Sequence, residues 1–253
     1  MSYDVIGNIA VLKFEKENLS EKKKIAEKIL KDRKNIKTVV EKLDKVKGRL
    51  RTLNIKHLAG KKTSETIHKE SGCLFKLNIE KCYFSPRISN ERLEIAKKIK
   101  SKNKVLVMFA GVLPFPIIIA KHSKCKEIVS IELGKECCKY GKENIKLNKL
   151  NNIKIIQGDV NKIIPKLAKQ KFDVIIMPRP QLKDTFLKSA FLVSKKSTKI
   201  FYYDFSRNIK EILEKIKKQA KKSKKQIKIL DIKKAGEVAP YKYKFRIEFI
   251  IKN

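Results

Sequence analysis

Four positions between residues 110 and 180 carry residues that could bind an organic ligand, and each follows an apolar run. If these runs are parallel strands, their carboxyl ends meet at one edge of a sheet, where such sheets bind ligands. A glycine there lets the backbone approach the ligand, and an acid about twenty residues later accepts hydrogen bonds from ribose hydroxyls. The four positions are Gly111, Glu132, Asp159 and the segment 178–180, which reads Pro-Arg-Pro.

The first of these turns, residues 107–115, contains one glycine, Gly111. Leu113 stands where a dinucleotide-binding turn would have a second glycine, so a pyrophosphate is disfavoured. An adenosine ligand without a phosphate, such as S-adenosylmethionine, fits this turn better. Asp159 suits such a ligand, because a carboxylate at the end of the third strand can accept a hydrogen bond from the exocyclic amine of adenine.

Each of these positions also has an ordinary structural interpretation. Gly111 suits any strand-to-helix turn, and Glu132 suits a solvated loop. Asp159 or Asn161 could cap the helix that follows. The prolines of segment 178–180 make a rigid turn whatever its purpose. The combination of the glycine turn with the acid is what predicts an adenosine-containing ligand.

The elements that must position these residues alternate between apolar runs and helical stretches. This alternation is typical of a parallel sheet covered on both faces. Two long runs near the end of the chain predict an antiparallel pair at one edge of the sheet: residues 226–233 and 241–251. The expected parallel strands are residues 104–109, 127–131, 153–157, 172–177 and 200–203, and the expected helices are residues 88–100, 134–148, 162–168 and 207–222.

The first part of the chain, residues 1–86, has shorter alternating runs, which predict a small α+β domain. Ser20 is expected to cap a helix that runs to Leu30. The expected strands are residues 3–14, interrupted at Gly7-Asn8, and residues 38–43, 48–58, 65–70 and 72–77.

The charge of the chain is strongly unbalanced. Among 253 residues, 63 Lys and Arg oppose 26 Asp and Glu, which gives a formal net charge of +37. A polyanion is the partner that this charge favours, and nucleic acid is the first candidate. The alternative is that lysine has replaced other polar surface residues, through codon bias or adaptation to heat.

The sequence disfavours a metal site, a disulfide framework and a membrane span. The five cysteines form no C-x-x-C pair and the three histidines form no H-x-x-x-H pair, so we expect no metal site and free thiols in a reducing cytoplasm. The longest apolar run, near residues 114–120, is too short to span a bilayer. The N-terminus lacks the basic-then-apolar order of a signal peptide.

Three motifs follow one another in the middle of the chain: HKE-x-G at residues 68–72, YFSPR-x-x-x-ER at residues 83–92 and MFAGV-x-PF at residues 108–115. In this order they resemble the archaeal and eukaryotic tRNA (guanine-37-N1)-methyltransferases, and the resemblance runs from about Gly7 to the end. It implies an α/β fold, with a Rossmann-like class I methyltransferase sheet preceded by a small α+β domain. It also implies S-adenosylmethionine as methyl donor without a metal. Many members have an N-terminal domain that reads the outer corner of tRNA, and we expect this chain to lack it.

The resemblance implies roles for particular residues. Arg51, in the GRLRT segment, matches the arginine that binds the target guanine, and Glu91 matches the proposed general base. Residues 1–86 would form the domain on the RNA and target-base side, and residues 87–253 would form the donor-binding catalytic domain. The residues expected to contact the donor are Tyr83, Arg92, Phe109, Gly111, Glu132, Leu133, Asp159, Val160 and Pro178.

The segment M-P-R-P at residues 177–180 departs from the common pattern of the family, which has asparagine at the position of Pro178 in an N-L-P or N-P-P motif. The segment is similar to that of an archaeal subgroup that also methylates carbon 7 of the tricyclic wyosine precursor at position 37. The resemblance therefore implies a second activity, and it adds Pro178 and Arg179 to the expected catalytic residues.

The residue types agree with this chemistry. A carboxylate can remove the proton from N1 of guanine as the methyl group is transferred, and an arginine at O6 can stabilise the developing negative charge. The expected partner is the anticodon stem-loop of tRNA, bound by a monomeric cytoplasmic protein. Basic side chains expected to contact RNA phosphates are Lys61, Lys62, Arg87 and Arg207.

Two other functions stay open at this point. The aminocarboxypropyl transferase of the wyosine pathway shares much of this architecture, and the choice between the two transfers depends on which carbon of the sulfonium faces the acceptor. A non-catalytic RNA-binding protein would need the basic faces, but it has no need for Glu91, Glu132 and Asp159 together.

Overall fold

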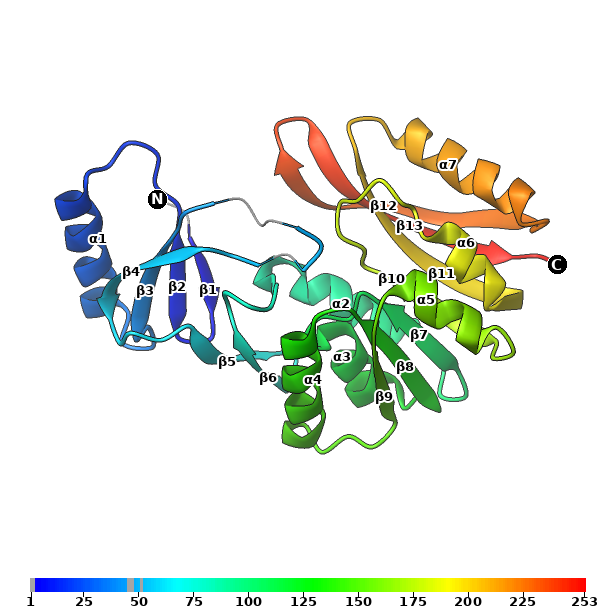
Figure 1. Ribbon diagram of the computed structural model, residues 1–253, viewed down its shortest axis with the longest axis horizontal. Helices are drawn as coiled ribbons and strands as arrows, with labels where there is room; N and C mark the ends of the chain where they lie inside the picture. The colour runs from blue at the N-terminus through cyan, green and yellow to red at the C-terminus, as the bar shows by residue number, and fades with distance from the viewer. Residues whose placement is uncertain (1–2, 45–47, 51) are drawn as a thin grey trace.

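The computed structural model describes residues 3–44, 48–50 and 52–253. Their strands form three sheets, of four, two and seven strands. In Figure 1 the four-stranded sheet and helix α1 (Leu19–Asp32) lie at one end of an elongated molecule, and the seven-stranded sheet with its helices lies at the other end. The two-stranded sheet lies between them.

The seven-stranded sheet has the order β12-β13-β11-β10-β7-β8-β9. Its strands β7 to β11 are parallel, and β13 runs antiparallel between β11 and β12. This arrangement confirms the predicted Rossmann-like sheet and the antiparallel pair at its edge. The strands are β7 Lys104–Met108, β8 Glu127–Glu132, β9 Ile153–Gln157, β10 Phe172–Met177, β11 Ser194–Ser206, β12 Ile227–Ala239 and β13 Lys242–Ile251.

Both faces of this sheet are covered, because alternate residues along each strand enter different cores. In β7, Val105 and Val107 pack with helices α2, α3 and α4 on one face. Leu106 and Met108 pack with helices α5, α6 and α7 on the other face. The bounds of these helices are α2 Ser89–Lys97, α3 Pro114–Ser123, α4 Lys135–Leu147, α5 Val160–Ile163, α6 Leu187–Leu192 and α7 Ile209–Lys222.

The four-stranded sheet has the order β1-β2-β3-β4 and packs against α1. The cap predicted for α1 was wrong: Asn18, not Ser20, accepts a hydrogen bond from the backbone of Glu21, and the Glu21 side chain bonds back to the Asn18 backbone. The strand predicted at residues 48–58 also begins later than expected. The strands are β1 Asp4–Ile6, β2 Ile9–Leu12, β3 Thr38–Lys42 and β4 Ile55–Gly60.

The two-stranded sheet, β5 (Glu65–Glu70) and β6 (Cys73–Asn78), is attached to helix α4 by two asparagines. The Asn144 side chain bonds the backbone N–H and carbonyl of Lys76, and the Asn148 side chain bonds those of Leu74. These amides satisfy backbone groups at the open edge of the β6 strand. The hairpin is therefore fixed to the large sheet, next to the YFSPR segment and its short 3₁₀ helix η1 (Pro86–Ile88).

Neither a membrane-spanning helix nor a metal site is found in the part of the chain that the structure describes. No helix there is long and apolar enough to cross a membrane. No group of three or more His, Cys, Asp or Glu side chains in the same residues is arranged to hold a metal ion.

Candidate active site

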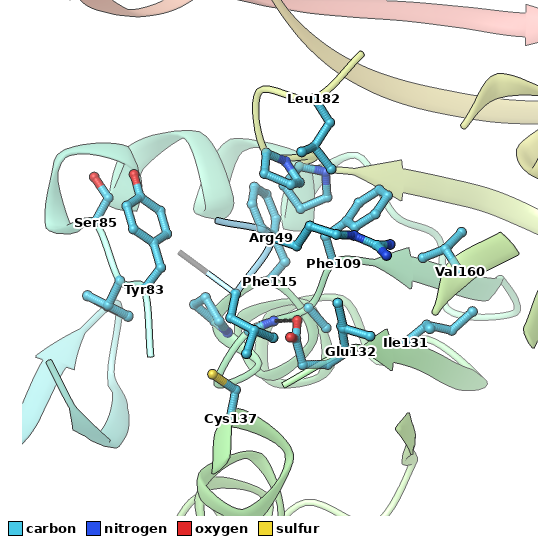
Figure 2. A pocket seen from close by; sticks show the side chains of 18 of the residues that line it. Arg49, Tyr83, Ser85, Phe109, Phe115, Ile131, Glu132, Cys137, Val160 and Leu182 are labelled. Carbon is cyan, nitrogen blue, oxygen red and sulfur yellow. Dashed lines mark hydrogen bonds between the residues drawn. The ribbon is translucent and has the colours of Figure 1, made fainter. Parts of the chain in front are cut away.

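A cavity lies at the carboxyl ends of β7, β8, β9 and β10. Since β8 and β10 flank β7 on opposite sides, this is the point where the strand order reverses and where open α/β sheets bind ligands. The cavity has a volume of about 970 Å³, part of which is open to solvent. It is lined by every residue predicted to contact the donor: Tyr83, Arg92, Phe109, Gly111, Glu132, Leu133, Asp159, Val160 and Pro178. Figure 2 shows Tyr83, Phe109, Glu132 and Val160 around it.

Glu132, the last residue of β8, organises the turn beside it (Figure 2). Its Oε2 accepts a hydrogen bond from the backbone N–H of Gly111 at 2.7 Å, and its Oε1 accepts one from Gly134 at 2.7 Å. Burial raises the pKa of this carboxyl, and the bonds from the backbone N–H groups oppose that rise. Each oxygen can accept a further hydrogen bond. Glu132 can therefore hold the Gly111 turn and bind a pair of ribose hydroxyls at the same time.

The Gly111 turn contains left-handed backbone at Phe109 (φ 59°), Gly111 (φ 58°) and Leu113 (φ 71°). A Cβ on Gly111 would lie 3.7 Å from the carbonyl oxygen of Tyr83, so its backbone angle rather than lack of space explains the glycine. Leu113 adopts the same region at a steric cost, and its side chain is fully buried in the core. Two non-glycine residues with this geometry in one turn are typical of a functional site.

Asp159 lines the cavity and also caps a helix, so both interpretations of this residue apply. Its Oδ1 accepts a hydrogen bond from the backbone N–H of Asn161, at the start of α5. Its Oδ2 lies 2.5 Å from Nη2 of Arg49, another cavity-lining residue. The hydrogen bond from Arg49 holds the pKa of Asp159 below its usual value. Arg49 was not predicted as a site residue, although it lies two positions before Arg51, which is outside the described residues.

Arg92 lies in the cavity wall with its charge neutralised. Its guanidinium donates two hydrogen bonds to Glu70, at 2.6 and 2.5 Å, and one to the carbonyl of Ser85 at 3.0 Å. The Phe84 ring lies 5.2 Å from the guanidinium carbon. The HKE motif, which supplies Glu70, and the ER motif therefore meet in one buried ion pair that holds the YFSPR segment against the cavity.

Glu91, the neighbour of Arg92, points in a different direction. It is 6% exposed and is not among the residues that line the cavity. Its Oε1 accepts hydrogen bonds from the Tyr203 hydroxyl at 2.8 Å and from Nη1 of Arg246 at 2.7 Å. Its Oε2 lies 3.3 Å from the ammonium of Lys233. Glu91 thus connects α2 to β11, β12 and β13.

The side chains of Pro178 and Arg179 also point in different directions. Pro178 lines the cavity, whereas Arg179 is 3% exposed and its Nη2 lies 2.5 Å from Oδ1 of the buried Asp204. In this structure, the Arg179 guanidinium therefore faces the protein interior and not the solvent.

The side chains expected to contact RNA come from three places on the surface. Lys61 and Lys62 are exposed in the loop after β4, and Arg207 is exposed before α7. Arg87, which is also largely solvent-accessible, donates a hydrogen bond from Nε to Asp4 at 2.7 Å. All four lie outside the donor cavity.

A second cavity adjoins the first one and is lined by the four-stranded sheet, the YFSPR segment and the β12–β13 hairpin. Its volume is about 1450 Å³, much of it open to solvent. Four basic residues line it, Lys13, Lys42, Arg87 and Lys244, against two acidic ones, Asp4 and Glu237. The residues that line both cavities are Tyr83, Phe84, Ser85, Ile88 and Lys244. A donor in the first cavity and an acceptor in the second would thus share one wall.

Comparison with known sequence families gives two matches. Residues 66–230 match the TRM5/TYW2 methyltransferase domain, and residues 1–63 match the TYW2 N-terminal domain. A similar protein is the tRNA (guanine(37)-N(1))/4-demethylwyosine(37)-methyltransferase Taw22 of Nanoarchaeum equitans, with 35% identity over 99% of this chain and 100% of that protein. The tRNA(Phe) (4-demethylwyosine(37)-C(7)) aminocarboxypropyltransferase of Methanocaldococcus jannaschii is 38% identical over 81% of this chain and 78% of that protein.

Solved structures are similar over the whole chain. The structure of a complex of aTrm5 and tRNALeu has a TM-score of 0.90 and 31% identity, and the match covers 100% of this chain and 72% of that one. The crystal structure of Methanocaldococcus jannaschii Trm5 in complex with adenosine has a TM-score of 0.86 and 30% identity, with 100% and 74% covered.

Proposed function

The chain belongs to the TRM5/TYW2 methyltransferase family, and we propose that it methylates N1 of guanine 37 in tRNA with S-adenosylmethionine as donor. The observation that carries the proposal is the pair of adjoining cavities that share one wall. The first cavity has the residues that an adenosine needs, and the second has the basic lining that a nucleotide needs.

The residues around the first cavity fit S-adenosylmethionine. The turn at residues 107–115, which forms part of the cavity lining, has Leu113 in place of the second glycine that a pyrophosphate would need. Glu132 would bind the ribose hydroxyls and Asp159 the adenine amine, with Phe109 and Val160 as apolar walls. Tyr83, Arg92, Gly111, Leu133 and Pro178 would complete the site. When bound, the donor supplies an electrophilic methyl carbon on its sulfonium.

The second cavity would receive the target base. A base that is splayed out of an RNA loop commonly stacks on aromatic side chains. Tyr83 is 37% exposed and lines both cavities, so it can contact the base and the donor. Lys13, Lys42 and Arg87 would attract the phosphates beside the base. Holding the acceptor against the donor in this way would supply a large part of the rate.

We assign the proton transfer to Glu91 and the stabilisation of O6 to Arg51. Glu91 lies one side chain behind the shared wall: it bonds the Tyr203 hydroxyl, and the ammonium of Lys244 lies 4.9 Å from the Tyr203 ring. A carboxylate that takes the proton from N1 makes that nitrogen nucleophilic. Reaching N1 would require the Glu91 side chain to turn from Arg246 towards the cavity.

Surfaces outside the two cavities would hold the tRNA. We propose that residues 1–86 act on the RNA side and residues 87–253 on the donor side, with a monomer binding the anticodon stem-loop in the cytoplasm. Lys61, Lys62, Arg87 and Arg207, with the exposed lysines of α7, would contact phosphates. The net charge of +37 supports this assignment.

A second methylation, at carbon 7 of the tricyclic wyosine precursor, is favoured by Pro178. Its side chain lines the donor cavity and offers no hydrogen bond, so it makes no polar contact that would select guanine over a larger flat base reaching the donor from the second cavity. The similarity to Taw22, whose name contains both activities, also supports it. Transfer of an aminocarboxypropyl group is the competing reaction, given the similarity to the transferase from Methanocaldococcus jannaschii.

Nucleoside analysis by mass spectrometry separates these reactions. The purified protein is incubated with S-adenosylmethionine and a tRNA that carries either guanine or the tricyclic precursor at position 37. We expect 1-methylguanosine from the first tRNA and a methylated tricycle from the second. A tRNA with adenine 37 is the control. An aminocarboxypropyl product, or no product from guanine, would exclude the proposed function.

A further inference from the structure

The loop after β10 forms one wall of the donor cavity and has a buried arginine behind it. Pro178, Pro180 and Leu182 line the cavity. Arg179, between the two prolines, is turned away from the cavity and is 3% exposed. Its Nη1 donates hydrogen bonds to the carbonyl oxygens of Pro180 at 2.9 Å and of Leu182 at 3.2 Å. One guanidinium group therefore holds two backbone positions of the wall.

The other side of this guanidinium is fixed to β11. Its Nη2 lies 2.5 Å from Oδ1 of Asp204, which is 2% exposed, and its Nε donates to the Tyr202 hydroxyl at 3.3 Å. The Tyr202 hydroxyl in turn donates to Oδ2 of Asp204 at 3.0 Å. A buried charge pair whose hydrogen bonds are satisfied in this way has one well-defined geometry. The wall of the cavity is thus connected rigidly to the β11 strand.

These contacts also decide what the wall presents to a ligand. The prolines have no backbone N–H, and the carbonyls of Pro180 and Leu182 are directed to Arg179. The side chains of this wall that line the cavity, those of Pro178, Pro180 and Leu182, are apolar. A wall of this kind orients a ligand by its shape, so its position must be set accurately by the residues behind it.

We propose that Arg179 and Asp204 are positioning residues for the methyl donor: their ion pair sets the 178–182 wall against which the donor and the incoming base are aligned. Arg179 acts through the loop backbone and not through an RNA phosphate. The alignment of the base rests on the proposed function, whereas the effect on donor binding does not.

The experiment compares three variants by calorimetry with S-adenosylmethionine alone and by single-turnover methyl transfer. Removing Asp204 would leave Arg179 buried without its carboxylate, and removing Arg179 would leave Asp204 with only the ammonium of Lys215, 3.9 Å away. Either loss could unfold the protein, so the main variant is the neutral double variant Arg179→Gln/Asp204→Asn. Arg179→Lys keeps the charge opposite Asp204 but has a single nitrogen, which cannot also hold both carbonyls. Lys183→Gln removes an exposed charge from the same loop and is the matched control.

We expect the double variant to bind the donor about tenfold more weakly and to transfer methyl more slowly, while tRNA affinity is unchanged. Arg179→Lys should restore the melting temperature but not the donor affinity, and this difference separates positioning from a merely structural role. Wild-type donor affinity in the double variant, or full recovery of it in Arg179→Lys, would overturn the proposal. Failure of the wild-type protein to methylate tRNA would instead count against the proposed function, because donor affinity is measured without RNA.

Discussion

Glu132 is the residue whose removal tests the donor site most specifically, because both of its oxygens already bond the backbone around the cavity. Glu132→Ala should weaken S-adenosylmethionine binding by roughly 1.5–3 kcal/mol, the value of charge-assisted hydrogen bonds that are lost. Calorimetry measures this change. Glu136→Ala changes a partly exposed carboxylate at the start of α4; it is the control and should bind the donor normally. Unchanged affinity in Glu132→Ala would show that this carboxylate does not bind the donor.

Glu91 and Glu94 allow a matched test of the proposed base, since both contact Arg246 and Lys233. Glu91→Gln should lower the single-turnover rate on the order of 10²–10⁴-fold, the usual cost of losing a general base, with little change in tRNA affinity. Glu94→Gln loses the same ion-pair partners without the proposed base and should keep most of the rate. Equal rates in the two variants across pH would mean that Glu91 has only a structural role.

Residue types could be predicted from the sequence, but the direction of a charged side chain could not. Glu132 and Asp159 were predicted because their place after apolar strands specifies where their side chains lie. Arg179 was expected among the catalytic residues, but its partner Asp204 lies on the β11 strand, and a buried ion pair leaves no local pattern in the sequence. Glu91 and Arg92 are adjacent on a helix, yet only Arg92 lines the cavity.

At the scale of elements, the ion pairs between α2 and the β12–β13 hairpin make stability depend on pH. The hydrogen bond from Lys233, together with that from Arg246, lowers the pKa of Glu94 from 4.5 to about 2. A carboxyl with a lowered pKa in the folded state stabilises the protein above its unfolded pKa, and this contribution disappears as the pH falls from 4.5 towards 2. The melting temperature of the wild type should therefore exceed that of Glu94→Gln at neutral pH, and the two should converge in acid.

The control for this measurement is Glu136→Gln, since Glu136 lies 3.8 Å from Lys81 on an open surface. Its melting temperature should follow the wild type at every pH. A difference between wild type and Glu94→Gln that stays constant down to about pH 2 would contradict the assigned linkage.

The existence of the helices and strands was predicted more accurately than their ends. The parallel strands were found because strands buried on both faces are nearly continuous apolar runs, as β7 and β10 show, with Lys104 and Asp173 as their only charged residues. The ends of elements were less predictable, because they depend on single side chains. Asn18 and Ser20 are both good caps, and only the capping box with Glu21 decides between them. The β4 strand begins at Ile55 because it pairs with β3, a partner that its own sequence does not reveal.

For the whole molecule, the net charge of +37 predicts a strong dependence of tRNA binding on salt. The logarithm of the affinity should fall linearly with the logarithm of the salt concentration, because binding releases counterions from the RNA. Reversing two exposed lysines of α7, Lys217→Glu and Lys218→Glu, should reduce the slope by about 1–2. Fluorescence anisotropy with labelled tRNA measures it.

Lys139→Glu is the control, since α4 covers the opposite face of the large sheet from α7. Its slope should stay near that of the wild type. A tRNA affinity that does not change with salt would mean that the lysines serve solvation or thermal stability and not RNA binding.

The central claim, that this protein transfers a methyl group to N1 of guanine 37, is tested most directly by nucleoside analysis of a guanine-37 tRNA after single-turnover reaction with S-adenosylmethionine. We expect 1-methylguanosine at position 37, none in a tRNA with adenine at that position, and strongly reduced product with both Glu132→Ala and Glu91→Gln. Product of another mass at position 37, or methylation at a different nucleotide, would contradict it.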